Sequence, residues 1–171
     1  MNYQTAYRHA GFTLIELLVV IVVMGIALGM VVLQLMPDRL ASLREESARL
    51  SLLLENAGME ARASGRAIAW MGERGSYRFF HKNDYGDWVP IDDDAMFRSR
   101  TLPEGVNINE VTVESQPLKP GEYVIFSANT YAVPFRIRLA NEAGSAAVTG
   151  RSTGDVSYAL EGGQTVAVGG T

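Results

Sequence analysis

The chain has 171 residues, 47% hydrophobic and 20% charged, which is typical of a folded protein rather than a disordered one. Its formal net charge is −4, and charges of both signs are interspersed after position 38, so no basic stripe is available for nucleic acid. Cysteine is absent, which excludes a disulfide, a thiol nucleophile, a zinc–thiolate site and a lipid-modified cysteine.

The first predicted element is an apolar segment at residues 12–36. Its only polar side chains are Thr13, Glu16 and Gln34. As a helix it would span ~37 Å, which is enough to cross a bilayer. A core helix in so small a domain is rarely apolar on all sides. The segment is therefore predicted to be a transmembrane helix, and the small-xxx-small spacing of Gly25 and Gly29 would let such helices pack closely.

Glu16 is the unusual residue of this segment. A charge at the bilayer centre costs roughly 2.5–3.5 kcal/mol, and less near the interface. No residue of the same segment can neutralise it. Composition leaves two interpretations: the carboxylate reaches the headgroup level, or it finds a partner on another chain.

Residues Gly11-Phe12-Thr13-Leu14-Ile15-Glu16 resemble the cleavage and methylation signature of type IV pilins and type II secretion pseudopilins. The resemblance implies that a prepilin peptidase cuts between Gly11 and Phe12 and removes residues 1–11 as a cytoplasmic leader. Phe12 would become the N-methylated end of the mature chain, and Glu16 its fifth residue. The resemblance also implies that the amine of Phe12 pairs with Glu16 of a neighbouring subunit and so directs subunit assembly.

Two other interpretations of the segment compete with this one. A secretory signal cut near Ala27-Leu28-Gly29 would have a shorter apolar region and does not explain Glu16. A plain single-span anchor does not need the motif. Arginines lie on both sides of the segment, so charge does not decide its orientation. The resemblance implies a single-pass protein of the bacterial inner membrane with its C-terminal domain in the periplasm.

Residues 37–65 are predicted to form an amphipathic helix that continues the span and ends near Gly65, with a kink or local break at Pro37. Apolar or small residues spaced three and four apart define its buried face: Leu40, Leu43, Ser47, Leu50, Leu54, Ala57, Ala61 and Ser64. Charged residues, among them Glu45, Glu46 and Arg49, fall off this face. Packing on the sheet of the same domain is favoured over a coiled coil, because only four of the face positions are large and apolar.

Residues 66–160 are predicted to form a periplasmic β-rich domain, and residues 161–171 a flexible Gly-rich tail. A hairpin is expected around Gly72–Gly75, and a second turn at Lys82–Asp87. Further strands are expected at 88–91, 107–114, 123–128, 134–140, 146–149 and 156–160. The fold class is α+β: a long N-terminal helix, half membrane and half amphipathic, packed on an antiparallel domain of two small sheets.

The candidate chemistry in this domain is weak. The run Asp92-Asp93-Asp94 lacks the alternation that aims carboxylates at one calcium ion, so a solvated loop is favoured. His81 has no second histidine or cysteine nearby in the sequence. Trp70 and Trp88 are expected to be core or hairpin aromatics. The sequence predicts no catalytic residue, no metal ligand and no cofactor, and the protein is not expected to be an enzyme.

The C-terminal two-thirds resemble, more loosely, the H-type minor pseudopilins of type II secretion. The resemblance rests on Ala61–Arg66, Trp88 after a Gly-Asp turn, Leu102–Val106, Val124–Phe126, the strand around Phe135–Leu139 and Thr153–Val156. Residues 161–171 lack the carboxylate cluster of major pseudopilins and the cysteine usual in major pilins, which favours a minor subunit.

The expected function is therefore that of a minor subunit of the type II secretion pseudopilus, which helps to export folded proteins across the outer membrane. The implied partners are other major and minor pseudopilins, the prepilin peptidase and the inner-membrane secretion platform, with the chain embedded in the membrane before assembly. One alternative is a minor pilin of a type IV pilus that serves adhesion, motility or DNA uptake. Another is a membrane-anchored β domain that binds a periplasmic ligand and never assembles.

Overall fold

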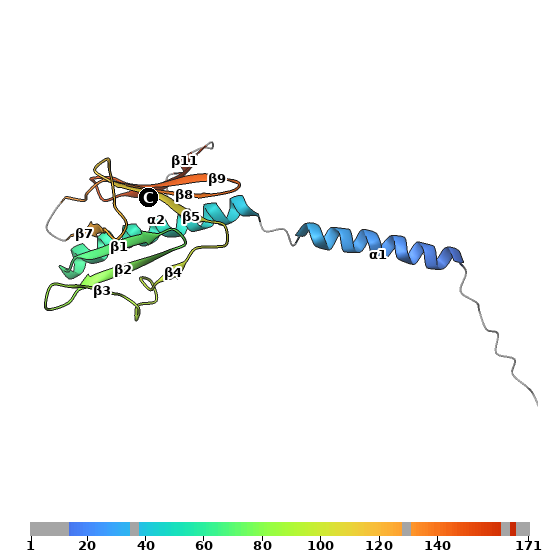
Figure 1. Cartoon of the computed structure of the whole chain (residues 1–171), viewed down its shortest axis with the longest axis horizontal. Helices are drawn as coiled ribbons and strands as arrows, with labels where there is room; N and C mark the ends of the chain where they lie inside the picture. The colour runs from blue at the N-terminus through green and yellow to red at the C-terminus, as the bar shows by residue number, and fades with distance from the viewer. Residues whose placement is uncertain (1–13, 35–37, 128–130, 162–164, 167–171) are drawn as a thin grey trace, which may run out of the picture. The chain divides into compact units, whose positions relative to one another are not determined.

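A computed structural model of the chain describes residues 14–34, 38–127, 131–161 and 165–166 (Figure 1). The chain divides into two compact units, Met1–Pro37 and Asp38–Thr171, and each is described by itself. Helix α1 (Leu14–Gln34) is the described part of the first unit. The predicted kink at Pro37 lies outside the described residues.

Helix α1 is apolar along its length. Every side chain from 14 to 27 is exposed within the described structure, including Glu16 in the first turn. Within the described residues, no helix meets both the length and the apolarity needed to cross a membrane.

The second unit opens with helix α2 (Arg39–Ser64), whose two ends are capped by its own sequence. The carboxylate Oδ1 of Asp38 accepts hydrogen bonds from the backbone N–H groups of Leu40 and Ala41, both at 3.0 Å. Gly65 follows the helix with φ = 70°, the left-handed conformation that glycine adopts without steric cost. The bounds of α2 are therefore set by local side-chain chemistry.

Two antiparallel sheets complete this unit. The five-stranded sheet contains β1 (Ile68–Glu73), β2 (Ser76–Lys82), β3 (Trp88–Pro90), β4 (Arg100–Thr101) and β7 (Val124–Phe126), in the order β3-β2-β1-β7 with β4 also paired to β2. The six-stranded sheet contains β5 (Asn107–Val113), β6 (Gln116–Pro117), β8 (Phe135–Asn141), β9 (Gly144–Gly150), β10 (Val156–Glu161) and β11 (Thr165–Val166), in the order β11-β10-β9-β8-β5-β6. The predicted fold class, α+β with two antiparallel sheets, is confirmed.

Hairpins with longer strands were predicted from the sequence, and very short strands were not. The predicted first hairpin is present, since Glu73 pairs with Ser76 across the turn Arg74-Gly75. Strands β4, β6 and β11 were not predicted, because two residues are too few to show an alternating pattern. The β5–β6 turn consists of Glu114 and Ser115, whose φ angles of 50° and 66° are unusual for residues with a side chain.

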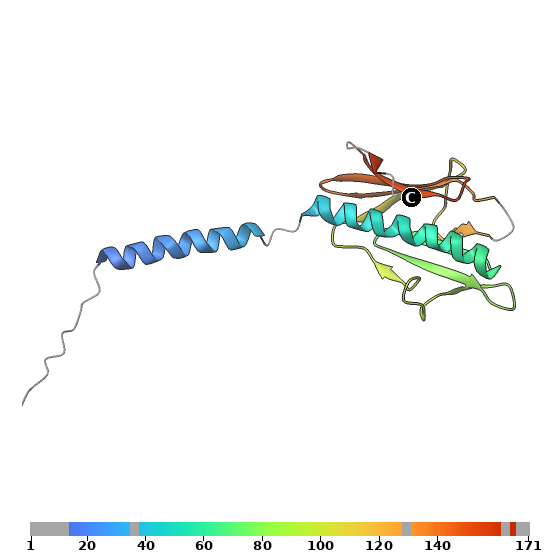
Figure 2. The ribbon, with the colours of Figure 1, turned by 180° about the vertical axis from the view of Figure 1, so that it is seen from behind.

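Helix α2 runs along the domain between the two sheets (Figure 2). It packs against β8, β9 and β10 of the larger sheet and against β1 and β7 of the smaller one. Six of the eight positions predicted for its buried face are buried, namely Leu43, Ser47, Leu50, Leu54, Ala57 and Ala61.

The other two predicted positions are wrong: Leu40 and Ser64 are exposed at the ends of the helix. Glu46, placed on the polar side, is buried, as are Ser51, Leu53 and Gly58. The reason is geometric. A helix that is covered by two sheets buries a wider arc than the single apolar stripe that its spacing predicts.

Aromatic side chains fill much of the core beneath the smaller sheet. Trp70, Tyr77 and Phe79 are almost fully buried, and successive ring centroids lie 6.3 and 6.2 Å apart. Trp88 is half-buried, with its ring centroid 5.6 Å from that of Tyr123 and 5.3 Å from the ammonium group of Lys82. Trp70 is thus a core residue, and Trp88 packs on the hairpin, as their positions predicted.

Candidate functional site

The residues predicted to carry function lie at the N-terminus. Gly11 and Phe12 precede the described residues, so the cleavage position lies outside the described structure. Glu16 is in the first turn of α1, where the dipole of the helix favours a carboxylate. Its side chain is exposed among apolar neighbours.

Helix α1 has a large exposed apolar surface. Leu14, Ile15 and Ile21 are 83%, 71% and 61% exposed. A Cβ atom built at Gly25 would meet nothing within 4 Å. So large an apolar surface requires a cover, either lipid or other helices. Glu16, in the first turn, is the one charged residue of α1, and the helix itself contains no complementary charge.

In the run Asp92-Asp93-Asp94, two of the carboxylates accept hydrogen bonds from the residues that follow. Oδ1 of Asp94 accepts hydrogen bonds from the backbone N–H groups of Met96 and Phe97, at 2.6 and 3.0 Å. Oδ1 of Asp92 accepts one from the hydroxyl of Ser99 at 2.8 Å. In the part of the chain that the structure describes, no three histidine, aspartate or glutamate side chains are grouped to hold a metal ion. These carboxylates shape the turn, and His81 is half-buried on β2.

A buried polar cluster connects α2 with β2, and it was not predicted from the sequence. Glu46 is 2% exposed; one oxygen accepts a hydrogen bond from the Tyr77 hydroxyl at 2.9 Å, and the other lies 2.6 Å from Nη1 of Arg49. Burial, reinforced by the adjacent Glu46 carboxylate, raises the pKa of Tyr77 well above its usual value. The only sequence signal was the i,i+3 spacing of Glu46 and Arg49, which also occurs on many exposed helices.

A second charged group crosses the outer face of the larger sheet. Glu161 on β10 lies 2.9 Å from Nη2 of Arg136 and 3.2 Å from Nη2 of Arg138, and it accepts a hydrogen bond of 2.6 Å from Ser145. Arg138 also lies 3.6 Å from Glu110. The hydrogen bond from Ser145, followed by the neighbouring arginines, lowers the pKa of Glu161.

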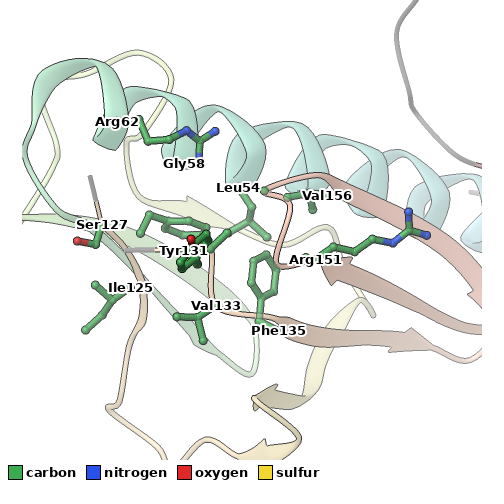
Figure 3. Close-up of a pocket in the computed structure, with 14 residues that line it drawn as sticks. Leu54, Gly58, Arg62, Ile125, Ser127, Tyr131, Val133, Phe135, Arg151 and Val156 are labelled. Carbon is green, nitrogen blue, oxygen red and sulfur yellow. The ribbon is translucent and has the colours of Figure 1, made fainter. Parts of the chain in front are cut away.

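A pocket of about 200 Å³ opens between α2, β7 and the β9–β10 turn (Figure 3). We call it the α2–β7 pocket. Its walls are mainly apolar, and Arg62 and Arg151 contribute the cations of its lining. Its lining also includes Leu54, Gly58, Phe126, Phe135, Gly154 and Val156.

Comparisons with known proteins bear on both the N-terminus and the domain. Residues 7–32 match the prokaryotic N-terminal methylation motif. The chain is 27% identical over 143 residues to type II secretion system protein H of Escherichia coli (strain K12), an alignment that covers 78% of this chain and 82% of that protein.

Solved structures share the fold. The minor pseudopilin EpsH from the type 2 secretion system of Vibrio cholerae superimposes with a TM-score of 0.55 at 16% identity, covering 70% of this chain and 97% of EpsH. The solution structure of E. coli GspH gives a TM-score of 0.53 at 20% identity, covering 70% and 89%. At these identities the match demonstrates the shared fold.

The methylation motif, the apolar α1 and a domain of one helix on two antiparallel sheets together define the class: the fold of the chain is pilin-like. Within that class, the resemblance to the H-type minor pseudopilins of type II secretion, predicted from the sequence, is confirmed.

Proposed function

We propose that the chain is a minor pseudopilin, a structural subunit of the type II secretion pseudopilus that helps to export folded proteins across the outer membrane. The observation that carries the proposal is the likeness to type II secretion protein H, which extends over 143 residues and so includes most of the β domain. A type IV pilus subunit would share the N-terminal motif, so it is the likeness of the domain that favours secretion over the pilus alternative.

The N-terminal residues have specific roles in this proposal. A prepilin peptidase removes residues 1–11 by cutting between Gly11 and Phe12, where the absent side chain of glycine lets an enzyme approach the backbone closely. Phe12 then receives an N-methyl group. Residues 12–36 hold the chain in the bacterial inner membrane before assembly, with the β domain in the periplasm.

Assembly depends on the charge of Glu16. Removal of the leader creates an amine at Phe12, about one helical turn before Glu16 in the same chain. When subunits stack, the amine of one chain can pair with the carboxylate of the next, and two charges in an apolar surrounding are relieved together. Such a pair fixes the axial stagger of subunits more than it adds stability, because both charges lose their solvation. The other partners in the proposal are major and minor pseudopilins and the inner-membrane secretion platform.

Mass spectrometry of the full-length protein tests the processing step. In cells with an active prepilin peptidase we expect a mature chain that begins at N-methylated Phe12. The same protein from peptidase-deficient cells should keep Met1. An intact leader in both strains would refute the proposal.

Glu16→Ala tests the assembly step. The variant should be processed normally but should fail to enter filaments, as measured by co-isolation with the other pseudopilins and by export of a secreted enzyme. Glu60→Ala is the matched control, because Glu60 is an exposed carboxylate on α2. Equal incorporation of both variants would contradict the role of Glu16. A deletion that abolishes twitching and leaves export intact would assign the protein to a type IV pilus instead.

A further inference from the structure

Among the described residues, no side-chain carboxylate forms an ion pair with either arginine of the α2–β7 pocket. All 19 aspartate and glutamate residues fall in the described part of the chain. Every ion pair among the described residues uses other cations than Arg62 and Arg151, so no side-chain carboxylate lies within 4.0 Å of either guanidinium. A guanidinium carries five N–H donors in a planar fork, which fits a carboxylate in bidentate geometry.

The guanidinium of Arg62, an exposed residue, lies close to two glycines. A Cβ atom built at Gly58 on α2 would lie 3.4 Å from its Nη1, and one built at Gly154 in the β9–β10 turn would lie equally close. Gly154 also has φ = 97°, a conformation in which a side chain is strained. The guanidinium therefore lies close to the backbone of both the helix and the turn. Figure 3 shows Arg62 beside Gly58 at the pocket.

The pocket beneath this charge is apolar and large enough for a side chain. Phe126 and Phe135 meet edge to face in its wall with ring centroids 5.8 Å apart, and Leu54 and Val156 complete that wall. Its volume of about 200 Å³ is several times the roughly 30 Å³ that one liquid water occupies. An apolar group is therefore the better occupant of the interior, and a carboxylate the better occupant of the rim.

The third feature is the strand beside the pocket. β7 is the last strand of the five-stranded sheet in the described part of the chain, and it pairs with β1 along one edge. The backbone groups on the other edge of a terminal strand are available to an extended segment of another protein. The pocket thus combines an apolar interior, a cation at its rim and a strand edge.

We propose that the α2–β7 pocket is a docking site for an extended segment of a different subunit of the same filament. The segment places an apolar side chain against Phe126 and Phe135 and an aspartate or glutamate side chain on Arg62. This inference rests on the proposed function, which supplies neighbouring subunits.

Site-specific cross-linking in cells tests it with the full-length chain. The photoreactive residue p-benzoylphenylalanine replaces Tyr131, which lies at the pocket and is 92% exposed. After irradiation, mass spectrometry identifies the peptide attached to it. We expect a peptide from another pseudopilin in which an acidic residue neighbours an apolar one. The same probe at Tyr85, 91% exposed on the β2–β3 turn and outside the pocket lining, is the control position.

Charge reversal then tests the role of Arg62. Arg62→Glu should lower the yield of that cross-link about tenfold, the change expected for 1.4 kcal/mol of lost interaction. Arg66→Glu, an exposed arginine near the end of α2 and outside the pocket lining, should leave the yield unchanged. Replacing the identified acidic residue of the partner by arginine should restore the cross-link to the Arg62→Glu chain.

The outcomes separate the two proposals. Three results would overturn the docking site alone. The first is an equal cross-link yield in Arg62→Glu, and the second is a cross-linked peptide without an acidic residue. The third is the absence of a cross-link from a chain that is correctly processed to Phe12 and co-isolated with other pseudopilins. A chain that is never processed would overturn the proposed function. An unchanged thermal unfolding midpoint of Arg62→Glu shows that the domain still folds.

Discussion

The hydroxyl group of Tyr77 donates a hydrogen bond to Oε1 of Glu46 across 2.9 Å and so connects β2 to α2 inside the core. The two side chains are 1% and 2% exposed, so water cannot replace either partner. The second oxygen of Glu46 is neutralised by Arg49, which is half exposed. A buried carboxylate is acceptable here because both of its oxygens have a partner.

Tyr77→Phe should therefore lower the free energy of unfolding by about 1–3 kcal/mol, because one oxygen of a buried carboxylate loses its donor. Chemical denaturation of the full-length protein in detergent, followed by tryptophan fluorescence, measures the loss. Tyr85→Phe is the control, since Tyr85 is 91% exposed and its removal should change nothing. Equal stability of the two variants would contradict the stabilising role of the cluster.

The same contact predicts alkaline sensitivity. The pKa of Tyr77 is raised in the folded state, so the folded protein binds this proton more tightly than the unfolded chain does. Its contribution to stability is complete below the ordinary tyrosine pKa of 10.0 and is lost as the pH rises above that value. Unfolding experiments at increasing pH should show a steeper loss for the wild type than for Tyr77→Phe. Parallel curves would refute this assignment.

Gly150→Ala should destabilise the domain by about 1–3 kcal/mol, the usual cost of overpacking a core. A Cβ atom at this position would overlap the ring of Phe135, which is itself buried against Phe126. Gly75→Ala is the control, because a Cβ atom there meets nothing within 4 Å. Thermal unfolding of the two variants compares them directly, and a stable Gly150→Ala protein would show that Phe135 can move aside.

The β5–β6 turn should accept a stabilising change. Glu114 and Ser115 both have positive φ, as a two-residue turn of this hairpin class requires, and Asn-Gly adopts that conformation with less strain. The double change Glu114→Asn with Ser115→Gly should raise the free energy of unfolding by about 1 kcal/mol. Ala143→Gly in the β8–β9 turn, where φ is not positive, should instead lower it. A shift of the same sign in both turns would contradict the argument.

The contribution of Glu161 to the free energy of unfolding should be lost at low pH. Its pKa is lowered in the folded state by Ser145 and the two arginines, so its contribution is present above the usual value of 4.5 and is lost as the pH falls through the lowered value. Glu161→Gln should reduce stability at pH 7 by at most about 1 kcal/mol, because the group lies on an outer face. The difference from wild type should shrink on acidification. Glu142→Gln is the control. It removes the ion pair between Arg39 and Glu142, whose side chains are 51% and 79% exposed, and it should leave the free energy of unfolding unchanged at any pH.

Several elements followed from local signals along the chain. Asp38 and Gly65 set the two ends of α2, because a capping carboxylate and a left-handed glycine act on their nearest neighbours. Strand β8 was predicted from the sequence because Phe135 and Ile137 alternate with arginines. The observed burial has the same period of two. The motif at Gly11 and Phe12 is likewise local, and its cleavage and methylation remain predictions.

The sequence by itself determined the fold class, because the methylation motif, the apolar run and the strand alternation each depend on residues close together in the chain. Only the tertiary structure decided that Glu46 is buried, that Glu161 meets Arg136 across an intervening strand, and that Arg62 lies beside Gly154 at an apolar pocket. The physical reason is that burial and charge pairing depend on which surfaces meet. That choice is made by the two sheets closing on α2, and no single segment of the chain contains it.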